Sequence, residues 1–355
     1  MHKNTQTTII GSGILASICA IAFKRNGITF DWYGSMPQNN DAMCYALHHK
    51  SICFLNQHQI FPTFNHIEEM ILHHDCISYD LHAKHSENPY LCSITQHNQL
   101  THALYQNLSE LDINAIPIQN QDYKNNTLII NSHAIKTPYI IAVDGPKSPI
   151  RRLIKAQQKH TQYEHHAHIA ILTHYESNKA VQQIFSNEGT FAILPISKHN
   201  SSLIWSCNPE QHKRILSNGI KHEISKILSI LGLTLTCIQH HQYLPIQSSL
   251  TPSFTHQNIA FAGSSLHTVH PLAGLGLNLG INDLDTLKDL IINHKPLIRY
   301  KTKRIPPHTF AQHLTHMGYL STKNPSLLKS LFKVMHHTRH PAAKSMILKA
   351  TQLFC

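Results

Sequence analysis

Residues 7–33, TTIIGSGILASICAIAFKRNGITFDWY, decide the fold of this chain. The apolar run at 7–10 predicts a buried strand, and the glycine turn GSGILA follows it directly. The stretch SICAIAFKRNG then predicts a helix that ends at Gly27, and ITFDWY predicts a second strand. Strand, tight glycine turn, helix and strand in this order form the first half of a dinucleotide-binding unit.

The turn carries the pattern Gly11-x-Gly13-x-x-Ala16. The first glycine allows the tight turn, the second lets main-chain N–H groups approach a pyrophosphate, and the small third residue lets helix and strand pack closely. An ordinary tight strand–helix turn is the alternative. The strand–turn–helix context favours a nucleotide site.

Two further motifs place glycine after an apolar strand. YIIAVDGPKSPIRR at 139–152 leads into Asp144 and Gly145, followed by Ser148 and Arg151. The third motif, FAGSSLHTVHPLAGLGLNLG, begins at residue 261 and precedes a helical pattern; it contains Gly263, Ser264, His267, His270, Pro271, Gly274, Gly276, Leu277 and Asn278. Glycines before a helix let the main chain approach a ligand closely, and a helix N-terminus attracts negative charge.

The rest of the chain predicts two interleaved lobes and a tail. HNQLTHALYQNLSE at 97–110 has helical spacing, whereas HIAILTHYE, TFAILPIS, SSLIWSC and IQHHQYLPI indicate short strands of a second sheet around the helix IKHEISKILSILG. The predicted class is α/β, a Rossmann-like FAD-binding domain with an inserted mixed or antiparallel sheet and C-terminal helices. We expect FAD-binding segments at 1–65, 95–153 and 255–295, substrate-lobe segments at 66–94 and 154–254, and a basic helical tail at 296–355.

The tail carries a strong positive charge. The chain has 355 residues, is 41% hydrophobic and has a formal net charge of +11, and no acidic residue follows Asp289. We expect tail helices broken at Pro306-Pro307, Pro325 and Pro341. In SLLKSLFKVMHHTRH one face is apolar, which suits a helix packed on the body or one lying on an anionic bilayer; its apolar residues are Leu327, Leu328, Leu331, Phe332 and Met335. Few aromatic residues and no recognised module argue against nucleic acid.

Cysteine and histidine usage argues against a metal centre. Eight cysteines are scattered without a CxxC spacing, which disfavours a disulfide framework or zinc site and fits a reducing compartment. The 32 histidines include several adjacent pairs, whose members point to different faces of a strand. We therefore expect histidines to fill surface positions and no metal to be bound. Without signal-peptide architecture at the start, the expected location is cytoplasmic, with peripheral contact at the inner membrane face.

With these motifs in view, the chain resembles the FAD-dependent class A aromatic hydroxylases, of which p-hydroxybenzoate hydroxylase is the type, and within them the ubiquinone-biosynthesis hydroxylase branch. The resemblance runs nearly end to end through IIGSGILAS, DAMCYAL, VDGPKSPIR, AGSSLHTVHPLAGLGLNLGINDLDTL and YKTKR. It implies that Gly11, Gly13 and Ala16 cradle the FAD pyrophosphate and that Asp144-Gly145 lies between the flavin and the path of the reductant. Pro271 to Asn278 would run under the isoalloxazine ring, where main-chain amides and a helix N-terminus stabilise the anionic reduced flavin.

The chain departs from the pattern of this family at four positions. The acidic residue that binds the adenosine ribose aligns with Gly34, and the arginine of the DxRxxAL segment aligns with Met43. The aspartate that contacts the ribityl chain aligns with Ser264, and the glutamine between two glycines aligns with Leu275. Each buried charge-assisted hydrogen bond contributes about 1.5–3 kcal/mol, so we expect weakly bound, exchangeable FAD.

The resemblance implies an FAD-dependent monooxygenase that hydroxylates the aromatic ring of a ubiquinone precursor through a flavin hydroperoxide. NAD(P)H or another donor would supply electrons, and the partners would be an apolar aromatic substrate, quinone-biosynthesis enzymes and, through the basic tail, a membrane surface. Catalytic residues are unassigned, with His267, His270 and Pro271 as candidates; for His267 a packed, hydrogen-bonded role is the alternative. Two other functions stay open, a catalytically silent scaffold in a quinone-biosynthesis assembly and a flavin oxidoreductase of the same fold acting on another apolar substrate.

Overall fold

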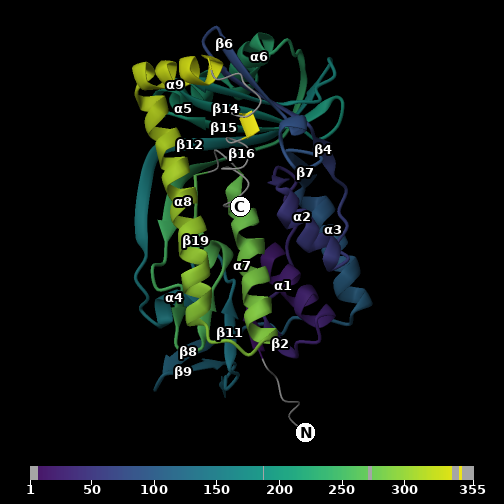
Figure 1. The fold of residues 1–355 in the computed structure, drawn as a ribbon, viewed down its shortest axis with the longest axis vertical. Helices are drawn as coiled ribbons and strands as arrows, with labels where there is room; N and C mark the ends of the chain where they lie inside the picture. Colours follow the sequence, from purple (N-terminus) through teal and green to yellow (C-terminus); the bar gives the residue numbers. More distant parts are fainter. Residues whose placement is uncertain (1–6, 187, 271–273, 338–343, 346–355) are drawn as a thin grey trace.

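A computed structural model of the chain describes residues 7–186, 188–270, 274–337 and 344–345. A parallel sheet lies at one end of the molecule and a large, mostly antiparallel sheet at the other, with α1 and α7 standing between them and α8 running along one side (Figure 1).

The parallel sheet has the strand order β17-β18-β11-β1-β2. Its members are β1 (Thr7–Ile10), β2 (Phe30–Tyr33), β11 (Tyr139–Ala142), β18 (Ile259–Phe261) and the antiparallel edge strand β17 (Thr255–His256). All four residues of β1 are buried, which is typical of a central strand covered on both faces. The chain passes from β1 to β2 on one side and then returns to β11 on the other, so β1 and β11 flank a topological switch point.

Helices cover this sheet with nearly continuous apolar surface. They are α1 (Ile14–Arg25), α3 (His97–Glu110) and α7 (Leu275–Ile292). Helix α3 has the bounds that its helical spacing predicted. The core of this region combines strand residues such as Ile9 and Ile141 with helix residues such as Ile18 and Leu284, all completely buried.

The second sheet has eight strands in the order β19-β16-β12-β15-β14-β13-β5-β6. Only the pair β13–β5 is parallel, so the expected mixed or antiparallel sheet is confirmed. The strands are β5 (Glu69–His74), β6 (Ile77–His82), β12 (Lys159–His174), β13 (Val181–Ser186), β14 (Gly189–Pro195), β15 (Asn200–Cys207), β16 (Leu235–Leu250) and β19 (His267–Thr268). Helices α5 (Pro209–Asn218) and α6 (Ile220–Ile230) pack on it around Trp205 and Leu228.

Small elements connect the two sheets. Strands β3 (Cys44–Leu47), β4 (Asn65–Ile67) and β7 (Cys92–Gln96) form one three-stranded sheet, and β8 (Gln121–Lys124), β9 (Thr127–Ile130) and β10 (His133–Ala134) form another. The remaining elements are α2 (His49–Gln57), α4 (Pro149–Leu153) and the 3₁₀ turns η1 (Ala83–His85) and η2 (Gly263–Ser265).

The predicted break at Pro306-Pro307 is wrong, because α8 (Ile298–Lys323) continues through both prolines. Each proline removes the N–H that would bond the carbonyl four residues earlier, here Thr302 and Lys303. Both of those residues are exposed, so water can satisfy their carbonyls. On the opposite face Arg304 and His308, on either side of the prolines, bond one carboxylate of α7 and hold the helix straight.

The second tail helix, α9 (Pro325–His337), begins at Pro325, where a break was expected. Its Leu328 and Phe332 are buried, and the Phe332 ring lies against His74 and Phe185. These contacts favour the first alternative for this helix, packing on the body; Pro341 and the side chains of Leu327 and Leu331 lie outside the described residues. Among the described helices, none combines the length and apolarity that crossing a bilayer requires.

The expectation that histidines fill surface positions is wrong for a substantial group of them. The buried histidines are His58, His74, His165, His168, His174, His267, His270 and His308. A half-polar imidazole can be buried when its nitrogens find hydrogen-bond partners, and most of these do.

Candidate functional site

Four loops with glycine meet at the carboxyl edge of the parallel sheet. Gly11 follows β1, Gly34 follows β2, Asp144-Gly145 follows β11 after Val143, and Gly263 follows β18 after Ala262. Parallel strands bring these ends to one side, and in open α/β sheets ligands bind outside the carboxyl ends at the switch point. The three sequence motifs are therefore neighbours in space.

The first motif presents bare main chain. A Cβ on Gly11, whose φ is +148°, would lie 2.3 Å from the carbonyl oxygen of Val143, so no side chain fits there. Gly13 has φ +99° and no atom within 4 Å of its Cβ position, and Ala16 is completely buried against the sheet. Gly13 is the N-cap of α1 and, within the described part of the chain, no side chain caps this helix. The N-terminal amides of α1 thus face open space, which suits a phosphate.

The end of β2 differs from this open loop. A Cβ on Gly34 would lie 1.9 Å from the carbonyl oxygen of Gly11, and the Trp32 indole donates a hydrogen bond to that same oxygen at 2.9 Å. Ser12 Oγ also accepts a hydrogen bond from the Ser35 amide, closing the two loops on each other. The absent acidic side chain at position 34 therefore reflects a backbone that leaves no room for any side chain.

Met43 lies half-buried before β3, and its carbonyl accepts a hydrogen bond from the His97 amide at the start of α3. A methionine offers no charge to a phosphate or a carbonyl, so this position contributes packing only. The Gly13 loop thus offers main-chain amides, whereas Gly34 and Met43 offer no polar side chain.

The second motif holds a carboxylate against the first. Asp144 Oδ2 accepts hydrogen bonds from Ser148 Oγ at 2.8 Å and from the Ile150 amide at 3.1 Å. Asp144 Oδ1 is buried and has no hydrogen-bond partner among the residues that the structure describes. Burial raises the pKa of this carboxyl above its usual range, although both hydrogen bonds oppose the rise. Gly145 follows with φ +84°.

Arg151 joins the second motif to the third. Its guanidinium donates to the carbonyl of Ser265 at 2.7 Å and to that of Pro146 at 2.6 Å. Ser265 Oγ in turn donates to the carbonyl of Ala142 at the end of β11. Two loops that are more than a hundred residues apart in sequence are fixed to each other by these bonds.

The third motif packs against α1. A Cβ on Gly263 would lie 2.2 Å from Leu15 Cδ2, and one on Gly280 of α7 would lie 2.8 Å from the same atom. Two glycines therefore make room for one leucine, directly after the Gly13 loop. Ser264 is exposed beside this contact.

Helix α7 begins with an open backbone. Gly274 is its N-cap in the left-handed conformation, φ +61°, and Gly276 is exposed with nothing within 4 Å of its Cβ position. Leu277 is half-buried. Leu275, which stands where the family has glutamine, is 3% exposed and packs with Leu279 and Ala311 of α8. This last departure therefore belongs to the helix interface; Pro271 lies outside the described residues.

Asn278 fixes the start of α7 to the first half of the chain. Its amide nitrogen donates to the carbonyl of Ala46, and its Oδ1 accepts a hydrogen bond from the His48 amide at 2.9 Å. Burial lowers the pKa of His48 to about 4, and its Nδ1 is buried without a partner within the described ranges. Sequence reasoning missed His48; its position directly after the DAMCYAL segment was the available signal.

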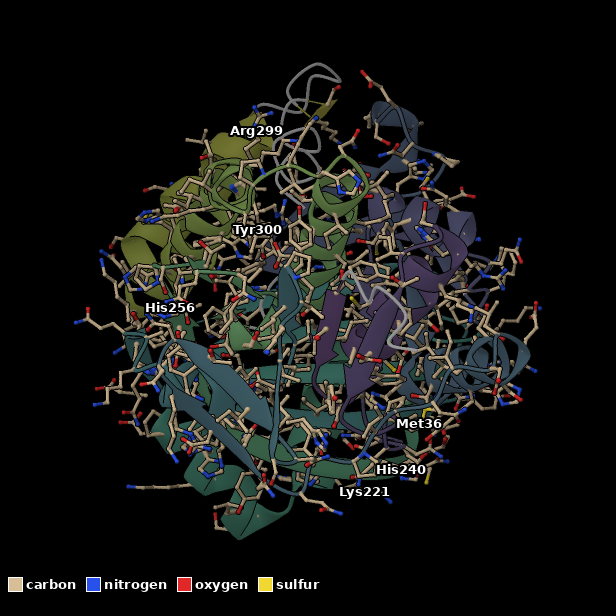
Figure 2. The ribbon with its side chains drawn as sticks, turned by 90° about the horizontal axis from the view of Figure 1, so that it is seen from below. Met36, Lys221, His240, His256, Arg299 and Tyr300 are labelled. Carbon is tan, nitrogen blue, oxygen red and sulfur yellow. The ribbon has the colours of Figure 1, made fainter. Side chains whose placement is uncertain are left out.

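A buried ionic cluster holds the third motif in place. Asp283 Oδ1 accepts hydrogen bonds from Arg304 Nε at 2.7 Å and His308 Nε2 at 2.8 Å, and Asp283 Oδ2 accepts one from the Gly263 amide. The neighbouring His308 and Arg304 keep the pKa of Asp283 far below its usual range despite burial. The buried Tyr300 hydroxyl donates a further hydrogen bond to the carbonyl of Phe261. Figure 2 labels Tyr300 and its exposed neighbour Arg299. The polar residues Asp283 and Arg304 inside otherwise apolar helix faces were the sequence signal for this cluster.

The two candidate histidines of the third motif are buried and neutral. His267 lies between Asp283 and His308, and burial lowers its pKa to about 3. His270 packs on Tyr163 at a centroid distance of 5.2 Å and reaches Ser206 Oγ at 3.3 Å, and burial lowers its pKa to about 3 as well. Neither imidazole carries a proton to give at neutral pH.

These residues fit FAD at its pyrophosphate. The uncapped N-terminus of α1 and the bare Gly13 provide main-chain donors with open space in front of them. At Gly34 the structure leaves no room for a side chain, so an acidic side chain there is excluded.

A parallel sheet with glycine loops meeting at its switch point defines the class of dinucleotide-binding proteins. The sequence pattern of one such family, the FAD binding domain, matches residues 2–294, so the chain belongs to the FAD binding domain family.

Curated relatives and solved structures agree with this family. The chain is 25% identical over 205 residues to 3-demethoxyubiquinol 3-hydroxylase of Escherichia coli, covering 54% of this chain and 52% of the relative. It is 25% identical over 272 residues to the mitochondrial ubiquinone biosynthesis monooxygenase COQ6 of Danio rerio, covering 62% and 56%. The chain thus spans about half the length of the curated relatives it matches.

The fold matches p-nitrophenol 4-monooxygenase PnpA of Pseudomonas putida with a TM-score of 0.80 at 12% identity, covering 99% of both chains. It also matches PqsL, a probable FAD-dependent monooxygenase of Pseudomonas aeruginosa, with a TM-score of 0.75 at 14% identity, covering 93% of this chain and all of the other. The similarity in fold thus extends over nearly the whole chain.

Proposed function

We propose that this chain is an FAD-dependent monooxygenase that hydroxylates the aromatic ring of a ubiquinone precursor. The observation that carries the proposal is the meeting of three glycine motifs at one sheet edge with an unpartnered Asp144 oxygen. The names of the two curated relatives, a 3-demethoxyubiquinol 3-hydroxylase and a ubiquinone biosynthesis monooxygenase, support the substrate class. Reduction by NAD(P)H or another donor is part of the proposal.

Bound FAD would supply the oxygen chemistry, since no amino-acid side chain activates O₂ for ring hydroxylation. The chain's own residues bind and orient. Gly13 and the first turn of α1 would receive the pyrophosphate, and Ser264 would accept or donate one hydrogen bond to the ribityl chain. Open amides around Gly276 would face the electron-rich edge of the ring.

Neutral histidines would serve this site by fixing the positions of the segments that surround it. His267 and Asp283 fix the turn that carries Gly263 and Ser264, and Asn278 fixes the start of α7. His48 Nδ1, close to Asn278 at the start of α7, is buried and has no hydrogen-bond partner among the described residues. We propose it as a hydrogen-bonding residue for the cofactor or the substrate.

The experiment is turnover with a defined product. Purified protein is supplied with FAD, NAD(P)H, O₂ and a short-chain demethoxyubiquinol analogue, and mass spectrometry follows a gain of one oxygen. We expect hydroxylated product that depends on FAD and is lost in Gly13→Ala. FAD uptake without product for any ubiquinol precursor would favour the flavin oxidoreductase, and no FAD uptake would favour the scaffold.

We also propose peripheral membrane contact through α8. Leu314, Met317 and Leu320 recur every three residues and are 36%, 54% and 39% exposed. Lys323 at the end of α8 and Lys329 and Lys333 of α9 are also exposed, and exposed apolar side chains together with lysines suit an anionic bilayer.

Sedimentation with anionic and neutral liposomes tests this contact. The double change Met317→Glu and Leu320→Glu should abolish binding to anionic vesicles, whereas Leu216→Glu on α5, also at an exposed apolar side chain, should leave it intact. Equal sedimentation of all three proteins would contradict the proposal.

A further inference from the structure

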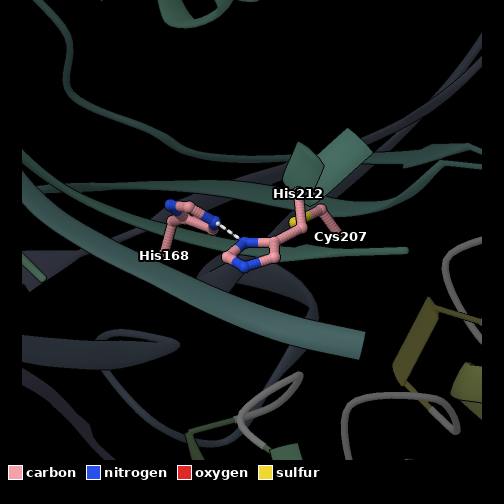
Figure 3. Close-up of side chains that lie close together, drawn as sticks. All are labelled: His168, Cys207 and His212. Atoms are coloured by element: carbon pink, nitrogen blue, oxygen red, sulfur yellow. Dashed lines mark hydrogen bonds between the residues drawn. The ribbon is translucent and has the colours of Figure 1, made fainter. Parts of the chain in front are cut away.

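A second group of chemistry-bearing side chains lies in the eight-stranded sheet, away from the nucleotide site. His168 of β12 is completely buried, Cys207 ends β15, and His212 lies in the first turns of α5 (Figure 3). One ligand atom from each of the three, an imidazole nitrogen or the Cys207 sulfur, lies within 4.8 Å of the other two. The β12–β15 pairing places Cys207 opposite His166, so residues 166, 168 and 207 share one face of the sheet.

The imidazoles of this group meet nitrogen to nitrogen. His168 Nε2 lies 2.9 Å from His212 Nδ1, and His168 Nδ1 lies 3.1 Å from His241 Nε2 on β16. The His166 ring stacks on that of His212 at a centroid distance of 3.9 Å. His166 Nδ1 is buried and, within the described chain, has no hydrogen-bond partner.

We propose that His168 Nε2, His212 Nδ1 and Cys207 Sγ bind one zinc ion, with solvent at the fourth position. Two imidazoles and a thiolate are the donor set of tetrahedral zinc, with Zn–N about 2.0–2.1 Å and Zn–S about 2.3 Å. Such a geometry separates two nitrogens by roughly 3.3 Å, so the 2.9 Å contact of His168 with His212 has to open by only a few tenths of an ångström.

His241 hydrogen-bonds the nitrogen of His168 that does not face the proposed ion. When His168 Nε2 coordinates, its Nδ1–H donates to His241 Nε2, and a hydrogen bond of this kind fixes the tautomer and ring orientation of a metal ligand. The other close group, His267, Asp283 and His308, is a poor match, because the Arg304 guanidinium already neutralises Asp283.

On binding, the zinc ion takes a lone pair from each imidazole and from the thiolate, and the thiol proton leaves to solvent. The ion then joins α5 to β12 and β15, so it stabilises the lobe without entering the flavin chemistry. This role goes beyond the proposed hydroxylase function and does not depend on it.

The test uses full-length, untagged protein stripped with a chelator and titrated with Zn²⁺ against a chromophoric chelator. We expect one tight site per chain and a higher unfolding temperature with zinc. Co²⁺ in place of Zn²⁺ should give tetrahedral visible bands and a thiolate charge-transfer band. His212→Ala and Cys207→Ser should each weaken the site at least about 100-fold.

The matched control is His222→Ala, an exposed histidine on the neighbouring helix α6, which should leave zinc affinity unchanged. If Cys207→Ser fails to fold, the partly exposed His212→Ala decides the question. Zinc affinity that His212→Ala does not reduce, several weak equivalent sites, or a cobalt spectrum without the thiolate band would each overturn the proposal.

Discussion

The two ends of the nucleotide site are built in different ways. At the pyrophosphate end the chain offers main-chain amides of Gly13 and α1 and the oxygen of Asp144, and at the ribose end it offers Gly34, which has no room for a side chain. Main-chain amides donate hydrogen bonds whatever the side chain is, so this end keeps its donors when residues are substituted. Side-chain partners can be lost one at a time, as Met43 and Ser264 illustrate. The comparison supports the proposal that this chain recognises FAD through backbone shape.

Acid should break the backbone end first, because neutral buried histidines support it. His267 and His270 have a pKa of about 3 in the folded protein against 6.5 for an unperturbed histidine, and His48 has a pKa of about 4. The unfolded chain binds protons that the folded chain refuses, so the free energy of unfolding falls as pH drops below about 6.5.

Each such histidine lowers the free energy of unfolding by about 2 kcal/mol between pH 7 and pH 5. Urea unfolding at pH 7.5, 6 and 5 should show a steep fall of the midpoint, accompanied by release of FAD. A midpoint that stays constant over this range would rule out this protonation account.

Gly11→Ala should give the next largest effect. The new methyl group overlaps the Val143 carbonyl and the backbone φ disfavours alanine, so the free energy of unfolding should fall on the order of 3–5 kcal/mol. Gly13→Ala is the control, since its Cβ meets nothing within 4 Å and only backbone strain of about 1–3 kcal/mol applies. Equal losses in denaturant unfolding would mean that the Gly11–Val143 contact is not as close as described.

Asp283→Asn should weaken the fold by about 3–5 kcal/mol, because Arg304 and His308 lose a buried partner. It should also lower FAD affinity, since Asp283 holds the Gly263 amide. Asp289→Asn on the exposed side of the same helix is the matched control and should behave as wild type. Thermal unfolding and flavin fluorescence measure both effects; a stable Asp283→Asn protein would show that the cluster is dispensable.

Restoring lost side chains should have the smallest effect and sharpens the comparison most. Ser264 is exposed, so Ser264→Asp can reach a ribityl hydroxyl and should tighten FAD binding by roughly tenfold or more, from about 1.5–3 kcal/mol. Met43→Arg should tighten it as well. Gly34→Asp should instead destabilise the protein, because its Cβ would overlap the Gly11 carbonyl. Tighter binding in Gly34→Asp would refute the proposed limit at the ribose end.

Much of the nucleotide half could be predicted from sequence, because local patterns determine it. The strand–turn–helix unit at the start and the helix at 97–110 follow from apolar spacing and glycine placement. Helix α5 was not predicted, since its residues are mostly polar, although Asn208 before Pro209 is a helix-start signal. Helix α8 stays continuous across its two prolines because Arg304 and His308 bond Asp283 of α7. No local sequence pattern predicts these tertiary contacts.

The histidine cluster escaped sequence reasoning for a related reason. Adjacent histidines on a strand point to opposite faces, whereas His166 and His168, with one residue between them, share a face. Their partners Cys207 and His212 come from another strand and a helix, and only the sheet pairing brings them together. From the sequence, Gly34 is a glycine where the family resemblance leads us to expect an acidic residue. Only the structure shows the steric reason, because the carbonyl of Gly11 occupies the space of a side chain.

Titration of flavin fluorescence with the purified chain tests the backbone account most directly. We predict saturable 1:1 binding of FAD, with a dissociation constant roughly in the micromolar range, that is lost in Gly13→Ala while the circular dichroism spectrum is unchanged. Absence of binding to the wild type, or equal affinity in folded Gly13→Ala, would contradict it.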